Sequence, residues 1–74
     1  MTKLNNKICF IVPCYNEENN INFTLDEINK VIKKLKVKYY EIIVIDDGSV
    51  DNTFLKVKKT NFLKKFKLKR NLGI

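Results

Sequence analysis

Four consecutive β-branched residues, Ile42 to Ile45, lead directly into acids and turn formers, and this stretch constrains the fold more than any other. A short apolar run bounded by turn residues is typical of a strand buried on both faces, as in a parallel sheet. Asp46, Asp47 and Gly48 follow at once. Because open α/β sheets bind ligands at the carboxyl ends of their strands, the sequence places a candidate site here.

The acidic cluster has two interpretations. In the structural one, Asp46 and Asp47 form a turn, while Ser49 or Asp51 caps the next helix. In the functional one, a carboxylate accepts hydrogen bonds from a ligand such as a nucleotide base or ribose. Adjacent carboxylates are costly to hold together unless a polar or cationic group meets them. Chemistry alone leaves both interpretations open for the two leading acids, whereas cap preference favours the structural one for Ser49 and Asp51.

The first half of the chain predicts a strand and an amphipathic helix. Residues 8–12, ICFIV, are apolar on both faces, and Pro13 is expected to end this strand. A polar loop follows, and a helix is predicted from about Asn20 to Lys36. Its apolar stripe recurs at steps of four and three and consists of Ile21, Leu25, Ile28, Ile32 and Leu35. This stripe is typical of a helix that packs on a core.

The second half predicts another helix and a short edge strand. The helix is expected from Thr53 to about Lys65, with an earlier end available at Thr60 and Asn61. Its residues predicted to face the sheet are Phe54, Val57 and Phe62. Residues 66–69, FKLK, alternate as an edge strand does, and residues 70–73 form a loop. The order β-α-β-α-β implies an α/β fold with a parallel three-stranded sheet, a Rossmann-like half with probable strand order 3-2-1.

Length and charge limit the remaining possibilities. The 74 residues suffice for one small domain, and the apolar runs fall short of the roughly 20 residues of a membrane span. A cytoplasmic location is therefore expected. Residues 1–51 hold 7 basic and 8 acidic residues, whereas residues 52–74 hold 8 basic and none acidic. The interpretation that a charge block alone favours is the solvated face of a helix and an edge strand. A small basic nucleic-acid-binding module that uses residues 54–70 is an alternative function, and contact with anionic lipid is another use of such a block.

Several other site classes lack their signatures. Cys9 and Cys14 are the two cysteines and the chain has no histidine, so a zinc site is disfavoured and small buried thiols are expected. Neither GxGxxG nor GxxxxGK[ST] occurs, so a bound nucleotide would depend on side chains and the acidic turn. A receiver-like signalling domain would carry its acid pair after the first strand, whereas this pair follows the second. A fragment with no independent function is also consistent with the sequence.

Two stretches, IVPCYNEENNI and YEIIVIDDGSVDNT, resemble the opening of family-2 glycosyltransferases with the GT-A fold. The resemblance is greatest to dolichyl- or polyprenyl-phosphate mannosyl- and glucosyltransferases. It covers residues 7–73 in order and ends with RNLG, which is similar to the family's RNxG. PxYNE together with a later DDGSxD is specific as a pair. Val50 and Asn52 depart from the family pattern, in which Thr or Pro and Gly are usual.

The resemblance implies a nucleotide-sugar site at the acidic turn. Tyr15 would pack near the base, and its alternative role is that of an ordinary, partly buried loop tyrosine. Asp47 would hydrogen-bond the base or ribose, with Asp46 supporting the same turn. The full set of implied nucleotide-sugar-binding residues is Pro13, Tyr15, Glu17, Ile45, Asp46 and Asp47. The donor would be a UDP- or GDP-sugar, the acceptor a polyprenyl or dolichyl phosphate, and nucleic acid would not be a partner.

The same resemblance implies that residues 1–74 are a single partial domain, the N-terminal part of an enzyme. The family's DxD-type metal motif and acceptor base have no counterpart here, so no catalytic or metal-binding residue is assigned. Mg or Mn is expected only for the full-length enzyme, and the fragment is expected to be inactive. Full-length relatives often act at the cytosolic face of a membrane. The strand that flanks residues 8–12 in the family is missing, which predicts an exposed edge and self-association.

Overall fold

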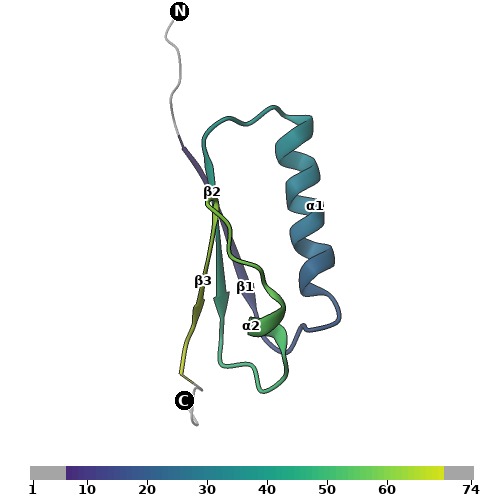
Figure 1. The fold of residues 1–74 in the computed structure, drawn as a ribbon, viewed down its shortest axis with the longest axis vertical. Coiled ribbons are helices and arrows are strands. Elements are labelled where there is room, and N and C mark those ends of the chain that lie inside the picture. The colour runs from purple at the N-terminus through teal and green to yellow at the C-terminus, as the bar shows by residue number, and fades with distance from the viewer. Residues whose placement is uncertain (1–6, 70–74) are drawn as a thin grey trace, which may run out of the picture.

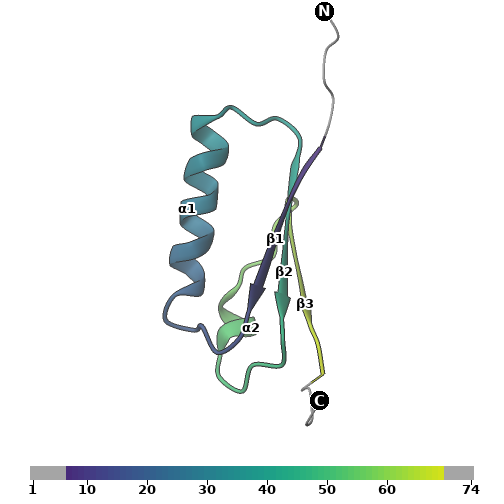
Figure 2. The same ribbon diagram turned by 180° about the vertical axis from the view of Figure 1, so that it is seen from behind.

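The computed structural model describes residues 7–69 and confirms the predicted β-α-β-α-β order. Its elements are β1 (Ile8–Cys14), α1 (Ile21–Lys34), β2 (Tyr40–Asp46), α2 (Thr53–Lys56) and β3 (Leu63–Lys67). Both neighbouring strand pairs are parallel, and the order β1-β2-β3 is the predicted 3-2-1 order read from the other edge. The two helices lie on the same side of the sheet (Figures 1 and 2). The fold is a small α/β unit consistent with half of a Rossmann-like domain.

The core lies between α1 and the face of the sheet that α1 covers. Ile21, Leu25 and Ile32 of the predicted stripe are buried, and Ile28 is partly buried. Leu35 was predicted to belong to the stripe, but this is wrong, since α1 ends before it and its side chain is 66% exposed. The sheet contributes alternate side chains to the same core, as the two-residue strand period requires, and these are Val12, Cys14, Ile42, Val44 and Leu63.

The helix ends in a hydrogen-bonded turn that a lysine occupies at some cost. The N–H of Lys36 donates to the carbonyl of Lys33 (3.1 Å), and the N–H of Val37 donates to that of Ile32 (3.1 Å). This pattern ends many helices and needs a left-handed residue at its centre, usually glycine. Lys36 has φ 53° and takes that conformation.

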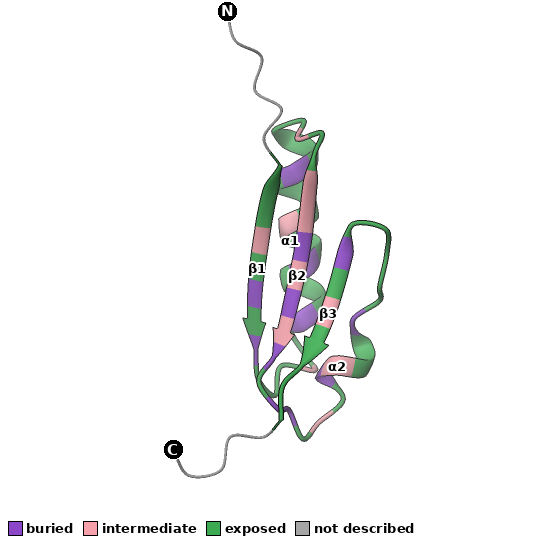
Figure 3. Ribbon diagram, turned by 90° about the vertical axis from the view of Figure 1, so that its left-hand side faces the viewer, coloured by how far each residue is buried: buried purple, intermediate pink, exposed green. Residues whose placement is uncertain are grey.

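The opposite face of the sheet is not covered by either helix (Figure 3). Burial of residues 42–45 on both faces, predicted from their composition, is therefore wrong within the described residues. Ile42 and Val44 are buried against the helices, whereas Ile43 and Ile45 alternate onto the other side and are only partly buried. We call this second side the open face. It also carries Ile11, which is 55% exposed and pairs in register with Ile43.

Pro13 does not end the first strand as predicted. It lies within β1 opposite Ile45, and β1 continues to Cys14. β1 is an edge strand, and the backbone groups of Ile8 and Cys14 bond toward β2. The backbone of the odd-numbered Pro13 therefore points away from β2, where a missing N–H breaks no hydrogen bond of the ladder.

The second helix is much shorter than predicted. α2 ends at Lys56, and Val57 already has extended backbone angles (φ −80°, ψ 120°). Val57 packs in the core, but Phe62 does not face it as predicted, since it is 49% exposed and stacks on Tyr40 with ring centroids 4.9 Å apart. The last strand is an edge strand as predicted but spans Leu63–Lys67, three residues earlier than expected at its start. The predicted loop at 70–73 lies outside the described residues.

The cysteines differ in burial. Cys14 is buried as expected, whereas Cys9 is exposed, so its predicted burial is wrong. Cys9 alternates with Phe10 onto the open face, which no helix of residues 7–69 covers. Within residues 7–69, no helix is long and apolar enough to cross a membrane.

Candidate functional site

Two loops meet at the carboxyl end of the sheet, one after β1 and one after β2 (Figures 1 and 2). The parallel register brings the last residues of the two strands together, with Cys14 opposite Asp46. The N–H of Asp47 then donates to the carbonyl of Cys14 at 2.9 Å. This is the edge at which open α/β sheets bind ligands, and it is where the sequence placed the candidate site.

The first contacts between these loops involve Asn16 and Ser49. The N–H of Asn16 donates to Ser49 Oγ (2.8 Å), and Asn16 Oδ1 accepts from the N–H of Val50 (3.0 Å). Asn16 has φ 51°, a left-handed conformation that Asn tolerates better than most residues. Ser49 is 3% exposed, so its hydroxyl is occupied in holding the loops and is not a helix cap as predicted.

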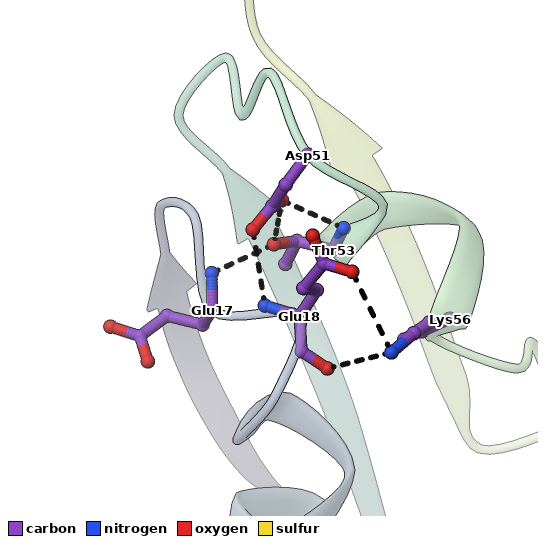
Figure 4. A network of polar contacts seen from close by, with 5 residues as sticks. All are labelled: Glu17, Glu18, Asp51, Thr53 and Lys56. Atoms are coloured by element: carbon purple, nitrogen blue, oxygen red, sulfur yellow. Dashed lines mark hydrogen bonds and ion pairs between the residues drawn. The ribbon is translucent and has the colours of Figure 1, made fainter.

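A second group of contacts joins the start of α2 to the loop before α1 (Figure 4). Thr53 Oγ1 accepts from the N–H of Glu17 at 2.8 Å and donates to a carboxylate oxygen of Asp51. Asp51 also accepts from the N–H groups of Thr53 (2.9 Å) and Glu18 (3.3 Å). Lys56 Nζ lies 3.7 Å from a carboxylate oxygen of Glu18. We call the two groups together the loop latch, formed by Asn16, Glu17, Glu18, Ser49, Val50, Asp51, Thr53 and Lys56.

The latch also lowers the pKa of Asp51. Desolvation raises the pKa of Asp51, but the hydrogen bonds from Thr53 and from the N–H of Glu18 outweigh it and hold that pKa below its usual range. Asp51 is therefore ionised at neutral pH and accepts three donors from the latch. Asp51 was predicted as a possible cap of the second helix, but the N-cap residue of α2 is Asn52. Asp51, one residue earlier, still accepts a hydrogen bond from the N–H of Thr53, the first residue of that helix.

Asp46 points inward and organises the turn. It is 0% exposed, and its Oδ1 accepts from the N–H of Ser49 at 2.7 Å. Gly48, between them, has φ 82°, a conformation that a side chain would oppose. This geometry agrees with the turn-supporting role expected of Asp46. Burial, followed by the charges of Asp46, Glu17 and Asp51, raises the pKa of the neighbouring Cys14 thiol to about 11.

Four of the six residues implied as nucleotide-sugar-binding lie at the paired ends of β1 and β2 or directly after them. Pro13 is exposed and pairs in register with the partly buried Ile45. Tyr15, 49% exposed, and Asp47, also exposed, each follow two positions later along the chain. Because side chains alternate along a strand, Pro13 and Ile45 share the open face, whereas Tyr15 and Asp47 lie in the loops just past the strand ends. The edge thus carries two apolar side chains, an exposed aromatic ring and an exposed carboxylate.

The other two implied residues are placed differently. Asp46 is buried on the helix side. Glu17 is exposed, and its carboxylate lies 3.5 Å from Asn20 Nδ2 while its backbone belongs to the latch. Sequence reasoning missed the latch roles of Asn16 and Thr53. Their residue types bond backbone groups readily, but nothing in the sequence shows that the partners lie across the other loop.

The described residues do not fit a metal ion. Within residues 7–69, no group of three or more His, Cys, Asp or Glu side chains is placed to hold one. Asp46 is buried and already accepts a hydrogen bond, which leaves only Asp47 of the adjacent pair toward solvent. No chemical step at this site is therefore assigned to a cation.

Comparison with known proteins identifies the family. The family model described as "Glycosyl transferase family 2" matches residues 9–74. The chain belongs to glycosyl transferase family 2. The match spans β1 through β3 and both loops of the latch, so the candidate site lies inside the part that defines membership.

Relatives with curated names fall in several branches of this family. The chain is 42% identical to the undecaprenyl-phosphate 4-deoxy-4-formamido-L-arabinose transferase of Proteus mirabilis (strain HI4320), over 65% of this chain and 14% of that protein. It is 39% identical to the poly-β-1,6-N-acetyl-D-glucosamine synthase of Staphylococcus aureus (strain MSSA476), over 89% of this chain and 16% of that protein. It is 37% identical to the dolichyl-phosphate β-glucosyltransferase of Dictyostelium discoideum, over 85% of this chain and 22% of that protein.

The chain thus spans between 14% and 22% of the length of these relatives. No solved structure matches it significantly. The family is established, whereas the activity named for each relative belongs to a much longer protein.

Proposed function

We propose that this chain is the nucleotide-sugar-binding portion of a family-2 glycosyltransferase. The whole enzyme would transfer a hexose from a UDP- or GDP-sugar to an acceptor such as a polyprenyl or dolichyl phosphate. The observation that carries the proposal is that Tyr15 and Asp47 are both exposed and directly follow the paired strand ends Cys14 and Asp46, in loops that the latch holds in place. Two of the named relatives carry a polyprenyl-type phosphate in their names, which supports this acceptor class.

The chemistry of the exposed pair suits a nucleoside. A tyrosine ring offers a flat apolar surface for a heterocyclic base. The carboxylate of Asp47 can accept hydrogen bonds from base N–H groups or ribose hydroxyls, and a ligand donor would replace water there. Pro13 and Ile45, paired in register two positions earlier on each strand, would add apolar surface to the site.

We further propose that residues 1–74 bind donor without transferring sugar. Among the described acids, Asp46 is buried in the turn, Asp51 and Glu18 bond within the latch, and Glu41 is paired with Lys7 and Lys64. None of the acids lies in a group that could hold a metal beside an acceptor base. The divalent cation expected of the whole enzyme, Mg or Mn, would be held by residues outside 7–69. Measurable sugar transfer by the purified chain would contradict this proposal.

The test is an amide NMR titration of the purified chain with UDP and with GDP, each with and without manganese. Dispersed resonances with shifts confined to residues near Tyr15 and Asp47 are expected, and the nucleotide that causes them identifies the base. Asp47→Asn and Tyr15→Ala should weaken binding, whereas Asp26→Asn, on the exposed side of α1, is the matched control and should not. A folded chain that ignores both nucleotides would refute the proposed site.

We also propose that the chain self-associates through β1. This strand ends the sheet among the described residues, and Ile8 and Ile11 on it are 44% and 55% exposed. An exposed apolar edge pairs readily with another strand, although Pro13 limits the usable length. Light scattering should show oligomers. A monomer with a sharp, cooperative unfolding transition would count against this proposal.

A further inference from the structure

Tyr15 and Asp47 stand on different loops, so the distance between them depends on the contacts that join those loops. Tyr15 follows β1 and Asp47 follows β2, and both side chains are exposed. A ligand that touches both needs this distance to be correct, because a hydrogen bond weakens steeply once its geometry departs from the optimum. The contacts next to the pair therefore bear on binding as well as on folding.

One hydrogen bond lies on each side of the pair. On the strand side, the N–H of Asp47 donates to the carbonyl of Cys14 at 2.9 Å. On the loop side, the N–H of Asn16 donates to Ser49 Oγ at 2.8 Å. Between these two contacts the first loop contains Tyr15 alone, and the second runs from Asp47 to Ser49 through a single glycine. The contact of Asn16 is thus the first link between the loops beyond the pair.

Asn16 bonds the second loop twice. Besides its N–H, its side-chain Oδ1 accepts from the N–H of Val50 at 3.0 Å. Ser49 is 3% exposed and is itself fixed, since its N–H donates to Asp46 Oδ1 at 2.7 Å. Asn16 is therefore attached to the buried part of the turn that carries Asp47.

The position of Asn16 suits few residue types. Its φ of 51° is left-handed, a conformation that Gly, Asn and Asp tolerate best. Gly would lack the acceptor for the N–H of Val50. Asp would keep that acceptor but would add a carboxylate where the charges of three acids already add to burial in raising the pKa of the Cys14 thiol. A neutral amide satisfies the backbone, the acceptor and the charge together.

We propose that Asn16 is a positioning residue for the nucleotide part of the donor. It sets the placement of Tyr15 relative to Asp47 and does not contact the ligand itself. Its N–H and its Oδ1 are both bonded to the second loop, so a ligand meets the pair at a spacing that Asn16 has fixed. This inference rests on the proposed function, because it concerns the same nucleotide-sugar site.

The test is an amide NMR titration of the folded chain with whichever of UDP and GDP binds the unsubstituted chain. Asn16→Gly keeps the left-handed backbone and removes the acceptor. It should weaken binding by about tenfold or more, the loss expected when a hydrogen bond to a charged group is misaligned. Asn61→Gly is the matched control, since it removes an exposed amide in the turn before β3, at the amino end of the sheet, and it should leave the affinity unchanged.

Further variants separate positioning from direct contact and from lost folding. Tyr15→Ala combined with Asn16→Gly should weaken binding by less than the product of the two single losses, because a ring that is absent cannot be misplaced. Asn16→Asp restores the acceptor, so its affinity for an uncharged nucleoside, uridine or guanosine, should exceed that of Asn16→Gly. Ser49→Ala removes the other half of the link and takes the place of Asn16→Gly, with the same expected loss, if that variant does not fold.

Three results would overturn the inference, and they are distinguishable. Equal affinity of folded Asn16→Gly and the unsubstituted chain would remove the positioning role and leave the nucleotide site intact. Single losses that multiply in the combined variant would mean that Asn16 contacts the ligand directly. Absence of nucleotide binding by the folded, unsubstituted chain would contradict the proposed function, and the role of Asn16 would fall with it.

Discussion

Thr53 joins both sides of the loop latch, and its hydroxyl offers a direct test of how much the latch stabilises the fold. The side chain is 0% exposed, accepts from the N–H of Glu17 at 2.8 Å and donates to Asp51. Thr53→Val keeps the shape and the β-branch while it removes the hydroxyl. Water cannot easily take its place, because Thr53 has no exposed surface.

The expected cost follows from the groups left behind. The N–H of Glu17 loses its acceptor, and an unsatisfied backbone group costs about 1–3 kcal/mol. Asp51 loses only the hydrogen bond from the Thr53 hydroxyl, because it still accepts from the N–H groups of Thr53 and Glu18. We expect the free energy of unfolding to fall by about 2 kcal/mol. A chain of this size is stable by roughly 4–11 kcal/mol in total, so the effect is large.

Urea denaturation measures this change. For a small domain the midpoint should move down by roughly 1–2 M. Thr24→Val is the matched control, since Thr24 is exposed on α1 and the two residues have similar helix propensity. Thr53→Ser keeps the hydroxyl and should cost less than the valine variant. If Thr53→Val costs no more than Thr24→Val, the latch does not stabilise the fold and our reasoning is wrong.

Three further predictions follow from individual residues. A thiol reagent at about pH 8 should modify exposed Cys9 quickly and buried Cys14 only on unfolding. Folding raises the pKa of Cys14 from 9.0 to about 11, so the free energy of unfolding should fall as the pH rises through that interval. Urea titrations of the chain and of Cys14→Ala would show this fall as a difference between the two. Lys36→Gly should stabilise the chain by about 1 kcal/mol in thermal or urea unfolding, since φ 53° suits glycine. Asp46→Ala should cost about 2 kcal/mol because a buried N–H loses its acceptor, whereas Asp47→Ala should change the unfolding free energy by less than about 0.5 kcal/mol.

Each of these has a contradicting result. Equal reactivity of the two thiols in the folded chain would mean that the sheet does not protect Cys14. A loss of stability in the glycine variant would mean that position 36 is not left-handed in solution. An equal cost for the two aspartate substitutions would remove the distinction between the turn-forming and the exposed acid.

Strong local patterns predicted the architecture of this chain. The run at 42–45 and the stripe of α1 have the periods of a strand and a helix, and parallel pairing follows from their alternation. The family resemblance rests on the two loops, and the family match bears it out. The sequence of residues 42–45 does not show whether one or both faces of the sheet are covered. The burial of Ile43 and Ile45 was therefore overestimated.

The lysine-rich region after Thr53 was the least predictable. Its sequence suits a helix face and an edge strand almost equally, and the choice depends on tertiary contacts. Val57 is held in the core, and Lys65 places its Nζ 4.3 Å from the ring of Phe54 while it donates to that residue's carbonyl at 2.7 Å. These contacts tie β3 to the single turn of α2. The pairing of the latch loops was equally hidden, because it joins residues more than 30 positions apart.

The latch has a consequence for ligand affinity. Ordering one backbone residue costs roughly 1–2 kcal/mol, and a ligand that must freeze mobile loops forfeits that amount from its binding free energy. Here the folded chain has already ordered residues 16–18 and 49–53 with its own hydrogen bonds. A substitution such as Thr53→Val could thus weaken a ligand that it never touches, with every direct contact unchanged. The entropy cost of ordering the loops at this edge is therefore met during folding, and a ligand that binds there does not meet it again.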